Sequence, residues 1–126
     1  MTSKTNSVTW FEIYVEDLER AKVFYESVFN YSLIQEKTDG IFNSYRFPGE
    51  MPGNGAMGAL MKHPMRSPSK EGTLIYFHCD DCQTQSELAI KNGGKVYRTK
   101  WSIGPDGFIA IIGDTEGNAI GLHSFK

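Results

Sequence analysis

The sequence lacks long apolar segments and any concentration of positive charge. Among its 126 residues, no apolar run approaches the ~18 residues of a membrane span, so no membrane partner is expected. The N-terminal residues MTSKTNS have no apolar core behind them, so no signal peptide is expected. A formal net charge of −2 without a basic stripe argues against a nucleic-acid partner. We therefore expect a cytoplasmic protein.

Cysteine and histidine are scarce, with two of the first and three of the second. Cys79 and Cys82 form one C-x-x-C at a predicted strand-to-helix junction, where a thioredoxin-type redox pair would sit. Asp80 and Asp81 oppose thiolate formation, although a helix N-terminus favours it, and one C-x-x-C alone is a weak zinc motif. We expect buried structural cysteines here rather than a redox pair.

What the sequence does contain is typical of one globular domain, with 40% apolar residues. Residues 8–29 predict a strand, a turn and a helix. Residues 8–15 alternate, so that Trp10, Glu12 and Tyr14 share the face that does not pack on the helix. Asp17 then stands where a helix N-cap belongs. An aromatic, a carboxylate and a phenol on one strand face make that face the first place to look for function.

The order of elements in the first half repeats in the second, which aligns Trp10 with Leu74 and Glu12 with Tyr76. Each half predicts one strand, one helix and three further strands. The predicted strands are 8–15, 31–36, 41–47 and 56–63 in the first half, and 73–79, 95–101, 108–112 and 119–124 in the second. The chain therefore divides into two βαβββ modules, at about 8–63 and 73–124, joined by a polar, proline-broken linker at 64–72.

With this repeat, the sequence resembles the vicinal oxygen chelate superfamily, which includes glyoxalase I, bleomycin-resistance proteins and extradiol dioxygenases. The resemblance covers nearly the whole chain and rests on VEDLERAKVFYESVF near the start, KNGGKV in the second half and DTEGNAIGLHS at the end. It implies an α+β fold in which the modules form a cupped, eight-stranded mixed sheet, with helices outside and a ligand cavity within. It also implies a homodimer.

The metal-dependent members of that superfamily take their ligands from the first and last strand of each module. Carried over to this sequence, these positions are Trp10, Met61, Leu74 and Gly121. None supplies the nitrogen or oxygen ligand that a glyoxalase or dioxygenase centre needs, and Met61 offers only a thioether. No cofactor is therefore expected, and the resemblance favours the metal-free binding members.

Strand alternation places aromatic and small side chains around the expected cavity. The predicted ligand-binding residues are Trp10, Glu12, Tyr14, Met61, Leu74, Tyr76, His78, Trp101 and Gly121. Glu12 is the candidate catalytic residue, because a carboxylate between two aromatic residues could act as a general base. Its alternative role is structural, as a hydrogen-bond partner of Arg46, Arg98 or a tyrosine hydroxyl.

A divalent metal stays open as the alternative to a metal-free site, through His63, His78 and His123 together with Glu12. The three histidines lack a tight ligand spacing, which favours exposed strand ends instead. Three functions follow, in this order: a protein that binds a small molecule in the sheet cavity; a lyase or isomerase resembling glyoxalase I, with a displaced metal or a Glu12 base; and a non-catalytic dimeric interaction module.

Overall fold

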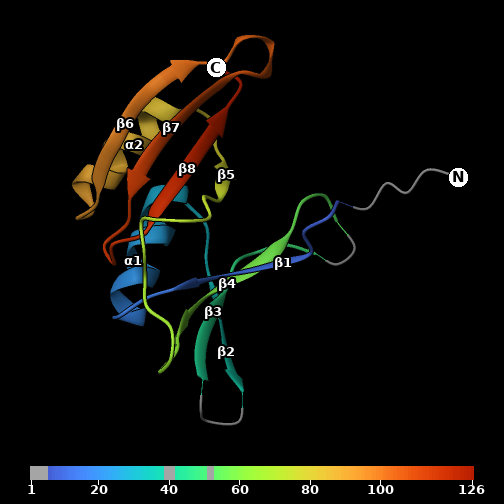
Figure 1. Ribbon diagram of the computed structural model, residues 1–126, viewed down its shortest axis with the longest axis vertical. Helices are drawn as coiled ribbons and strands as arrows, with labels where there is room; N and C mark the ends of the chain where they lie inside the picture. The colour runs from blue at the N-terminus through green and yellow to red at the C-terminus, as the bar shows by residue number, and fades with distance from the viewer. Residues whose placement is uncertain (1–5, 39–41, 51–52) are drawn as a thin grey trace, which may run out of the picture.

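The computed structural model describes residues 6–38, 42–50 and 53–126. The first module contains β1 (Trp10–Tyr14), α1 (Leu18–Phe29), β2 (Ile34–Thr38), β3 (Phe42–Arg46) and β4 (Met57–Lys62). The second contains β5 (Tyr76–His78), α2 (Cys82–Lys91), β6 (Lys95–Ser102), β7 (Phe108–Gly113) and β8 (Ala119–Ser124), with a short 3-10 helix, η1 (Gly104–Asp106), before β7. The predicted order of elements is confirmed (Figure 1).

The eight strands form two mixed sheets with the same internal order, which confirms the α+β class. The first sheet runs β1-β4-β3-β2 and the second runs β5-β8-β7-β6. In each, the first strand pairs in parallel with the last strand of its own module, and the other pairs are antiparallel. Within the described residues no ladder joins β1 to β5, so the strands divide into two four-stranded sheets rather than one continuous sheet.

Capping residues set the limits of α1 as the sequence predicts. The Asp17 carboxylate accepts a hydrogen bond from the Arg20 amide at 3.0 Å, and Glu19 lies in the first turn, where the helix dipole favours an acid. At the other end Asn30 adopts a left-handed conformation with φ of 58°, which ends the helix. In α2, Asp81 takes the same N-cap role and accepts from the Gln83 amide.

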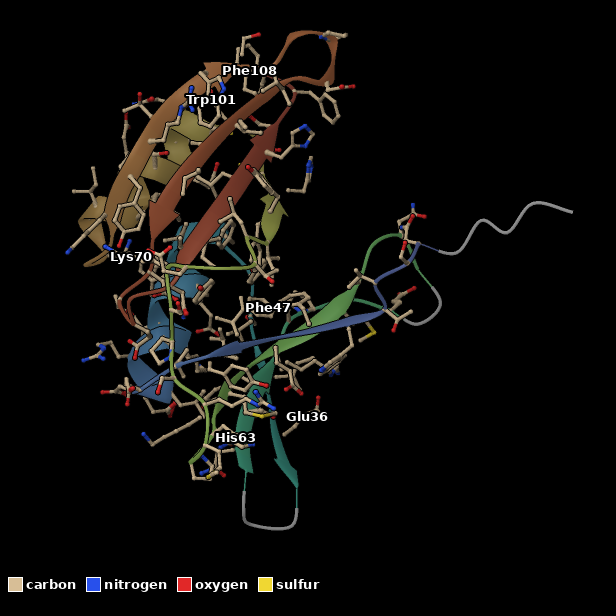
Figure 2. The ribbon with its side chains drawn as sticks, in the orientation of Figure 1. Glu36, Phe47, His63, Lys70, Trp101 and Phe108 are labelled. Atoms are coloured by element: carbon tan, nitrogen blue, oxygen red, sulfur yellow. The ribbon has the colours of Figure 1, made fainter. Side chains whose placement is uncertain are left out.

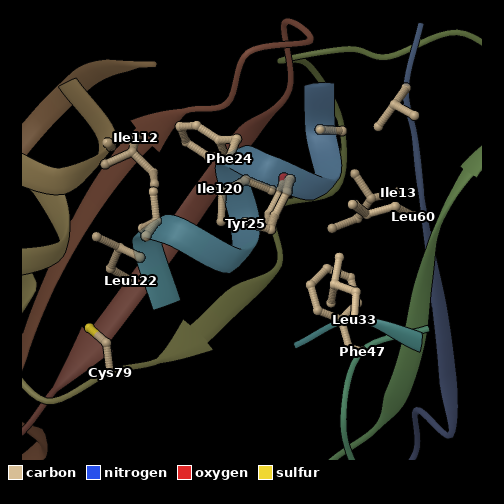
Figure 3. Packing of buried hydrophobic residues seen from close by; sticks show 14 of the residues in the cluster. Ile13, Phe24, Tyr25, Leu33, Phe47, Leu60, Cys79, Ile112, Ile120 and Leu122 are labelled. Carbon is tan, nitrogen blue, oxygen red and sulfur yellow. The ribbon is translucent and has the colours of Figure 1, made fainter. Parts of the chain in front are cut away.

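The first helix connects the two modules. Its buried residues, Phe24 and Tyr25 among them, lie between Ile13 and Leu60 of the first sheet and Ile112 of the second (Figure 3). A single hydrophobic cluster therefore runs through both modules. The helix expected outside the cup also forms the contact between the sheets, because its residues face both modules.

The strand β5 is shorter than expected, and the segment before it makes no ladder. Between β4 and β5 the described chain forms only an isolated bridge, between His63 and Arg66, and then runs back toward the second module (Figure 1). Residues 73–75, predicted to start the strand, make no ladder, although the Ile75 carbonyl accepts from the Gly121 amide at 2.9 Å. This leaves the segment before β5 to line the cavity described below. None of the described helices has the length and apolar character of a membrane span.

Candidate functional site

A cavity of about 680 Å³ lies between the two modules. Its walls come mainly from β1, the linker, residues 73–76 at the start of β5 and residues 118–120 at the start of β8. The structure brings five of the predicted ligand-binding residues into this wall: Trp10, Glu12, Tyr14, Leu74 and Tyr76. Trp10 and Tyr76 stay 42% and 46% exposed, so a ligand could cover large aromatic surfaces that the protein leaves open.

The Glu12 carboxylate is the polar centre of this wall. Its Oε1 accepts a hydrogen bond from the Tyr14 hydroxyl at 2.7 Å, and its Oε2 accepts from Trp10 Nε1 at 3.2 Å. The two possible arginine partners are engaged elsewhere, because Arg46 pairs with Glu36 and Arg98 stacks on Trp101. Of the structural roles considered for Glu12, the bond to a tyrosine hydroxyl is therefore the one observed. The general-base role stays a prediction.

Tyr14 connects this carboxylate to the rest of the fold. The hydrogen bond to Glu12, together with partial burial, raises the pKa of the Tyr14 hydroxyl, because the nearby negative charge disfavours a phenolate. Asn118 Nδ2 donates to the Tyr14 carbonyl at 2.9 Å, and the Arg66 guanidinium lies over the Tyr14 ring, 5.8 Å from its centroid. Tyr14 is thus a hydrogen-bond donor fixed from three sides.

Tyr76 reaches the cavity because the neighbouring strand carries a glycine. Gly121 is the register partner of Tyr76 across β5 and β8, and a Cβ at position 121 would overlap the Tyr76 ring. Gly121, predicted to bind the ligand, is therefore not part of the cavity wall; it lets the Tyr76 ring lie against the backbone of β8.

Three other predicted ligand-binding residues lie outside this cavity wall. Met61 lies on β4 as the register partner of Tyr14, and His78 lines a separate surface depression with Tyr76 and Ile109. Trp101 lies on β6, at the far edge of the second sheet, with the Arg98 guanidinium 3.5 Å from its ring centroid (Figure 2). Trp101 thus belongs to the predicted strand 95–101, which β6 extends by one residue, and does not reach this cavity wall.

The histidines do not gather around Glu12. His78 and His123 are register partners in the second sheet, and His123 Nε2 lies 2.6 Å from the Asp106 carbonyl oxygen. His63 follows β4 in the first sheet, where its Nδ1 accepts from the Met65 amide (Figure 2). Among residues 6–38, 42–50 and 53–126, no three His, Cys, Asp or Glu side chains are placed to hold a metal ion.

The positions that would carry the superfamily's metal also do not fit one. Trp10 uses its indole N–H as a donor to Glu12, and the space beside Gly121 is filled by the Tyr76 ring. A metal ion needs lone-pair donors, which neither arrangement provides. The metal-free expectation itself stays a prediction.

Asn118 was not identified from the sequence as a site residue, and its hydrogen bonds connect three of the segments around the cavity. Asn118, which directly precedes the predicted strand 119–124, donates to the Tyr14 carbonyl and accepts from the Ser69 amide at 2.9 Å. It is also bonded to the Asp114 carboxylate through its own amide and side chain. One buried asparagine thus joins β1, the linker and the β7–β8 turn, and a turn signal alone cannot reveal contacts so distant along the chain.

The same turn carries a second buried acid that binds the first module. Glu116 accepts from the Glu16 and Asp17 amides and from the Arg20 guanidinium, whose Nε lies 2.7 Å from Oε2. Burial opposes ionisation of this acid, but the hydrogen bonds from Arg20, Asp17 and Thr115 outweigh it and lower the pKa of Glu116 to about 2. Glu116 is therefore a structural carboxylate that holds the turn between β1 and α1 in place.

The two cysteines are buried and reduced, as predicted for structural residues. Cys82 is the first residue of α2, and its amide donates to the Ser124 hydroxyl at 3.1 Å. Burial, reinforced by the neighbouring Cys82, raises the pKa of the Cys79 thiol to about 12. This environment disfavours the thiolate that redox chemistry would need.

Comparison with known proteins identifies the same architecture elsewhere. The family model described as Glyoxalase/Bleomycin resistance protein/Dioxygenase superfamily matches residues 7–122. A glyoxylase-like domain-containing protein of Didymella fabae is 30% identical over 118 residues, which cover 88% of each chain.

Solved structures share the fold at lower identity. A glyoxalase I variant from Zea mays gives a TM-score of 0.71 at 20% identity, covering 92% of this chain and 46% of that one. The chain thus spans about half the length of that enzyme. A glyoxylase/bleomycin resistance protein/dioxygenase domain from Frankia gives a TM-score of 0.70 at 16% identity and covers 98% and 100% of the two chains.

Proposed function

Because the chain belongs to the Glyoxalase/Bleomycin resistance protein/Dioxygenase superfamily, we propose that it binds a small, partly aromatic or amphipathic molecule in the cavity between its modules, without the superfamily's usual metal. The observation that carries the proposal is the cavity wall itself. Trp10, Tyr14 and Tyr76 offer aromatic surface around the Glu12 carboxylate. A largely apolar wall with a few convergent polar groups is typical of small-molecule sites.

The structure suggests a direct test, because one of the two tryptophans lies in the cavity wall and the other does not. In a Trp101→Phe protein, Trp10 is the only tryptophan and reports on the cavity. We would titrate this protein with N-phenyl-1-naphthylamine, a neutral aromatic dye. Binding in the cavity should quench Trp10 and increase the dye emission.

A matched pair of variants tests whether the dye binds in the cavity. Thr73 is exposed and lines the cavity, so Thr73→Trp should obstruct part of the cavity and weaken dye binding. Thr84 is exposed on α2, and Thr84→Trp is the control for adding the same bulk elsewhere. For these two variants, binding is measured by dye emission alone, because the added tryptophan also fluoresces. Dye that binds the Thr73→Trp protein as well as the control would contradict the proposed site.

The enzyme alternative is tested on the same protein. We would measure the melting temperature with EDTA and then with Zn, Ni, Mn and ferrous iron in turn. A ligand that binds only the native state at 100 times its Kd stabilises it by about 2.7 kcal/mol, which is several degrees for a small domain. A metal-selective rise would favour a displaced metal site over the metal-free proposal. The expected homodimer stays a prediction.

A further inference from the structure

The charged side chains in the cavity wall have one sign. Glu12 and Glu71 line it, and among the described residues no lysine, arginine or histidine does. The protein as a whole is nearly balanced, with 13 basic and 15 acidic residues. The negative charge of this wall is therefore a local property and does not follow from the overall composition.

The Glu12 carboxylate holds this charge where a ligand can reach it. No ion pair neutralises it among the described residues, whose salt bridges involve Glu116, Glu26, Glu36 and Asp81 instead. An ionised carboxylate has about four acceptor sites, and Glu12 uses two of them for Trp10 and Tyr14. The other acceptor sites of the carboxylate stay available to a ligand in the cavity. The two rings that donate to Glu12 are held in place by these hydrogen bonds.

Aromatic rings beside an unpaired carboxylate have a definite ligand preference. The face of an indole or phenol ring attracts a cation, and several rings around one site recognise ammonium groups. Trp10, Tyr14 and Tyr76 all lie in the wall, and two of them donate to Glu12, which fixes their positions before a ligand arrives. Both features favour the same charge on the ligand.

From these observations we infer that the cavity takes an organic cation, an aromatic or amphipathic molecule with a protonated amine or a quaternary ammonium group. This inference rests on the proposed function, because it names the ligand class of the same cavity. The cationic group would lie at Glu12, and the apolar part would cover Trp10 and Tyr76.

The basic side chain beside Tyr14 should limit the preference of the cavity for cations. Arg66 lies 5.8 Å from the Tyr14 ring centroid, beside the cavity wall but not in it, with no carboxylate of the described residues within ion-pair distance. Its charge opposes a second cation near Tyr14. Arg66→Gln should therefore strengthen binding of a cation and leave a neutral molecule unaffected.

The test uses three compounds of the same shape and different charge: benzyltrimethylammonium, its neutral isostere neopentylbenzene, and phenylmethanesulfonate. Each is titrated into the Trp101→Phe protein, and Trp10 emission is followed. We expect the cation to bind most tightly and the anion most weakly. Added salt should weaken binding of the cation and not of the neutral compound, because screening acts only on the charge.

Two carboxylate variants separate the charge from the cavity. Glu12→Gln should weaken binding of benzyltrimethylammonium by about three- to tenfold more than it weakens binding of neopentylbenzene, the range for a solvent-accessible charge contact with aromatic rings. Glu87→Gln removes an exposed carboxylate on α2 and should change neither compound. Melting temperatures verify that both variants are folded.

The outcomes distinguish this inference from the proposed function. If the cation and its neutral isostere bind equally, or if Glu12→Gln weakens both to the same extent, the cavity binds small molecules but has no preference for cations. If N-phenyl-1-naphthylamine binds and none of the three compounds does, the inference also fails while the cavity stands. If the dye does not bind either, the proposed function fails with it.

Discussion

Arg20 and Glu116 join the start of α1 to the β7–β8 turn through two hydrogen bonds. Arg20 Nε lies 2.7 Å from Oε2 of Glu116, and the second guanidinium nitrogen lies 2.9 Å from Oε1. The Glu116 side chain is fully buried, whereas Arg20 is about half exposed. The two modules are therefore attached at a charged contact beside the β1–α1 turn, as well as through their shared apolar core.

Glu116→Gln should destabilise the protein by about 1–3 kcal/mol, the cost of weakening charge-assisted bonds to a buried acceptor. The measurement is the urea midpoint at neutral pH with the slope unchanged. Glu87→Gln, which leaves an acceptor for its exposed partner Gln83, should stay within about 0.5 kcal/mol of the parent. Equal midpoints for the two variants would show that the Glu116 contact adds nothing to stability.

The free energy of unfolding should decrease in acid as Glu116 becomes protonated. The pKa of Glu116 is about 2 in the fold against an ordinary value of 4.5, so its contribution is complete above about pH 4.5 and is lost as the pH falls toward 2. Urea midpoints measured between pH 6 and pH 2 should therefore converge for the parent and Glu116→Gln. A constant difference across that range would contradict the assignment of the low pKa to this carboxylate.

Gly121→Ala should act on ligand binding through Tyr76. The added Cβ would overlap the Tyr76 ring, so this ring, which is nearly half exposed, would have to move. We expect weaker quenching of Trp10 by N-phenyl-1-naphthylamine in the Trp101→Phe background. In a Tyr76→Ala protein the same substitution should have no further effect. A full effect in both backgrounds would place its cause elsewhere.

The native thiols should react slowly with Ellman's reagent at pH 8. Cys79 and Cys82 are buried, and the raised pKa of Cys79 keeps it protonated. Adding urea should release two fast-reacting equivalents, since both thiols are free. Two fast equivalents without urea would revive the redox-pair alternative.

Local signals were sufficient for much of the fold. Asp17 and Asn30 mark the limits of α1 through capping chemistry that depends only on near neighbours. Strand alternation placed Trp10, Glu12 and Tyr14 on one surface, and the internal repeat extended this reasoning to Leu74 and Tyr76. These five residues could be predicted because periodicity and repetition are properties of the sequence itself.

Contacts between the modules could not be predicted in the same way. Asn118 and Tyr14 are 104 positions apart, and their hydrogen bond exists only because α1 brings the β7–β8 turn against β1. The division into two sheets has the same origin, since alternation identifies the faces of a strand but not which strand lies beside it. Trp101 was predicted to bind the ligand, but β6 is the edge strand of the second sheet, and Trp101 lies outside the cavity wall.

The position of α1 between the sheets determines how this duplicated chain can come apart. Phe24 and Tyr25 complete the apolar interior of the second module although they belong to the first. Neither module therefore has a complete hydrophobic core of its own. If one module unfolds, apolar residues of the other become exposed to water. The repeat visible in the sequence is thus not a pair of separable folding units, and heat or denaturant should melt both halves in one cooperative step.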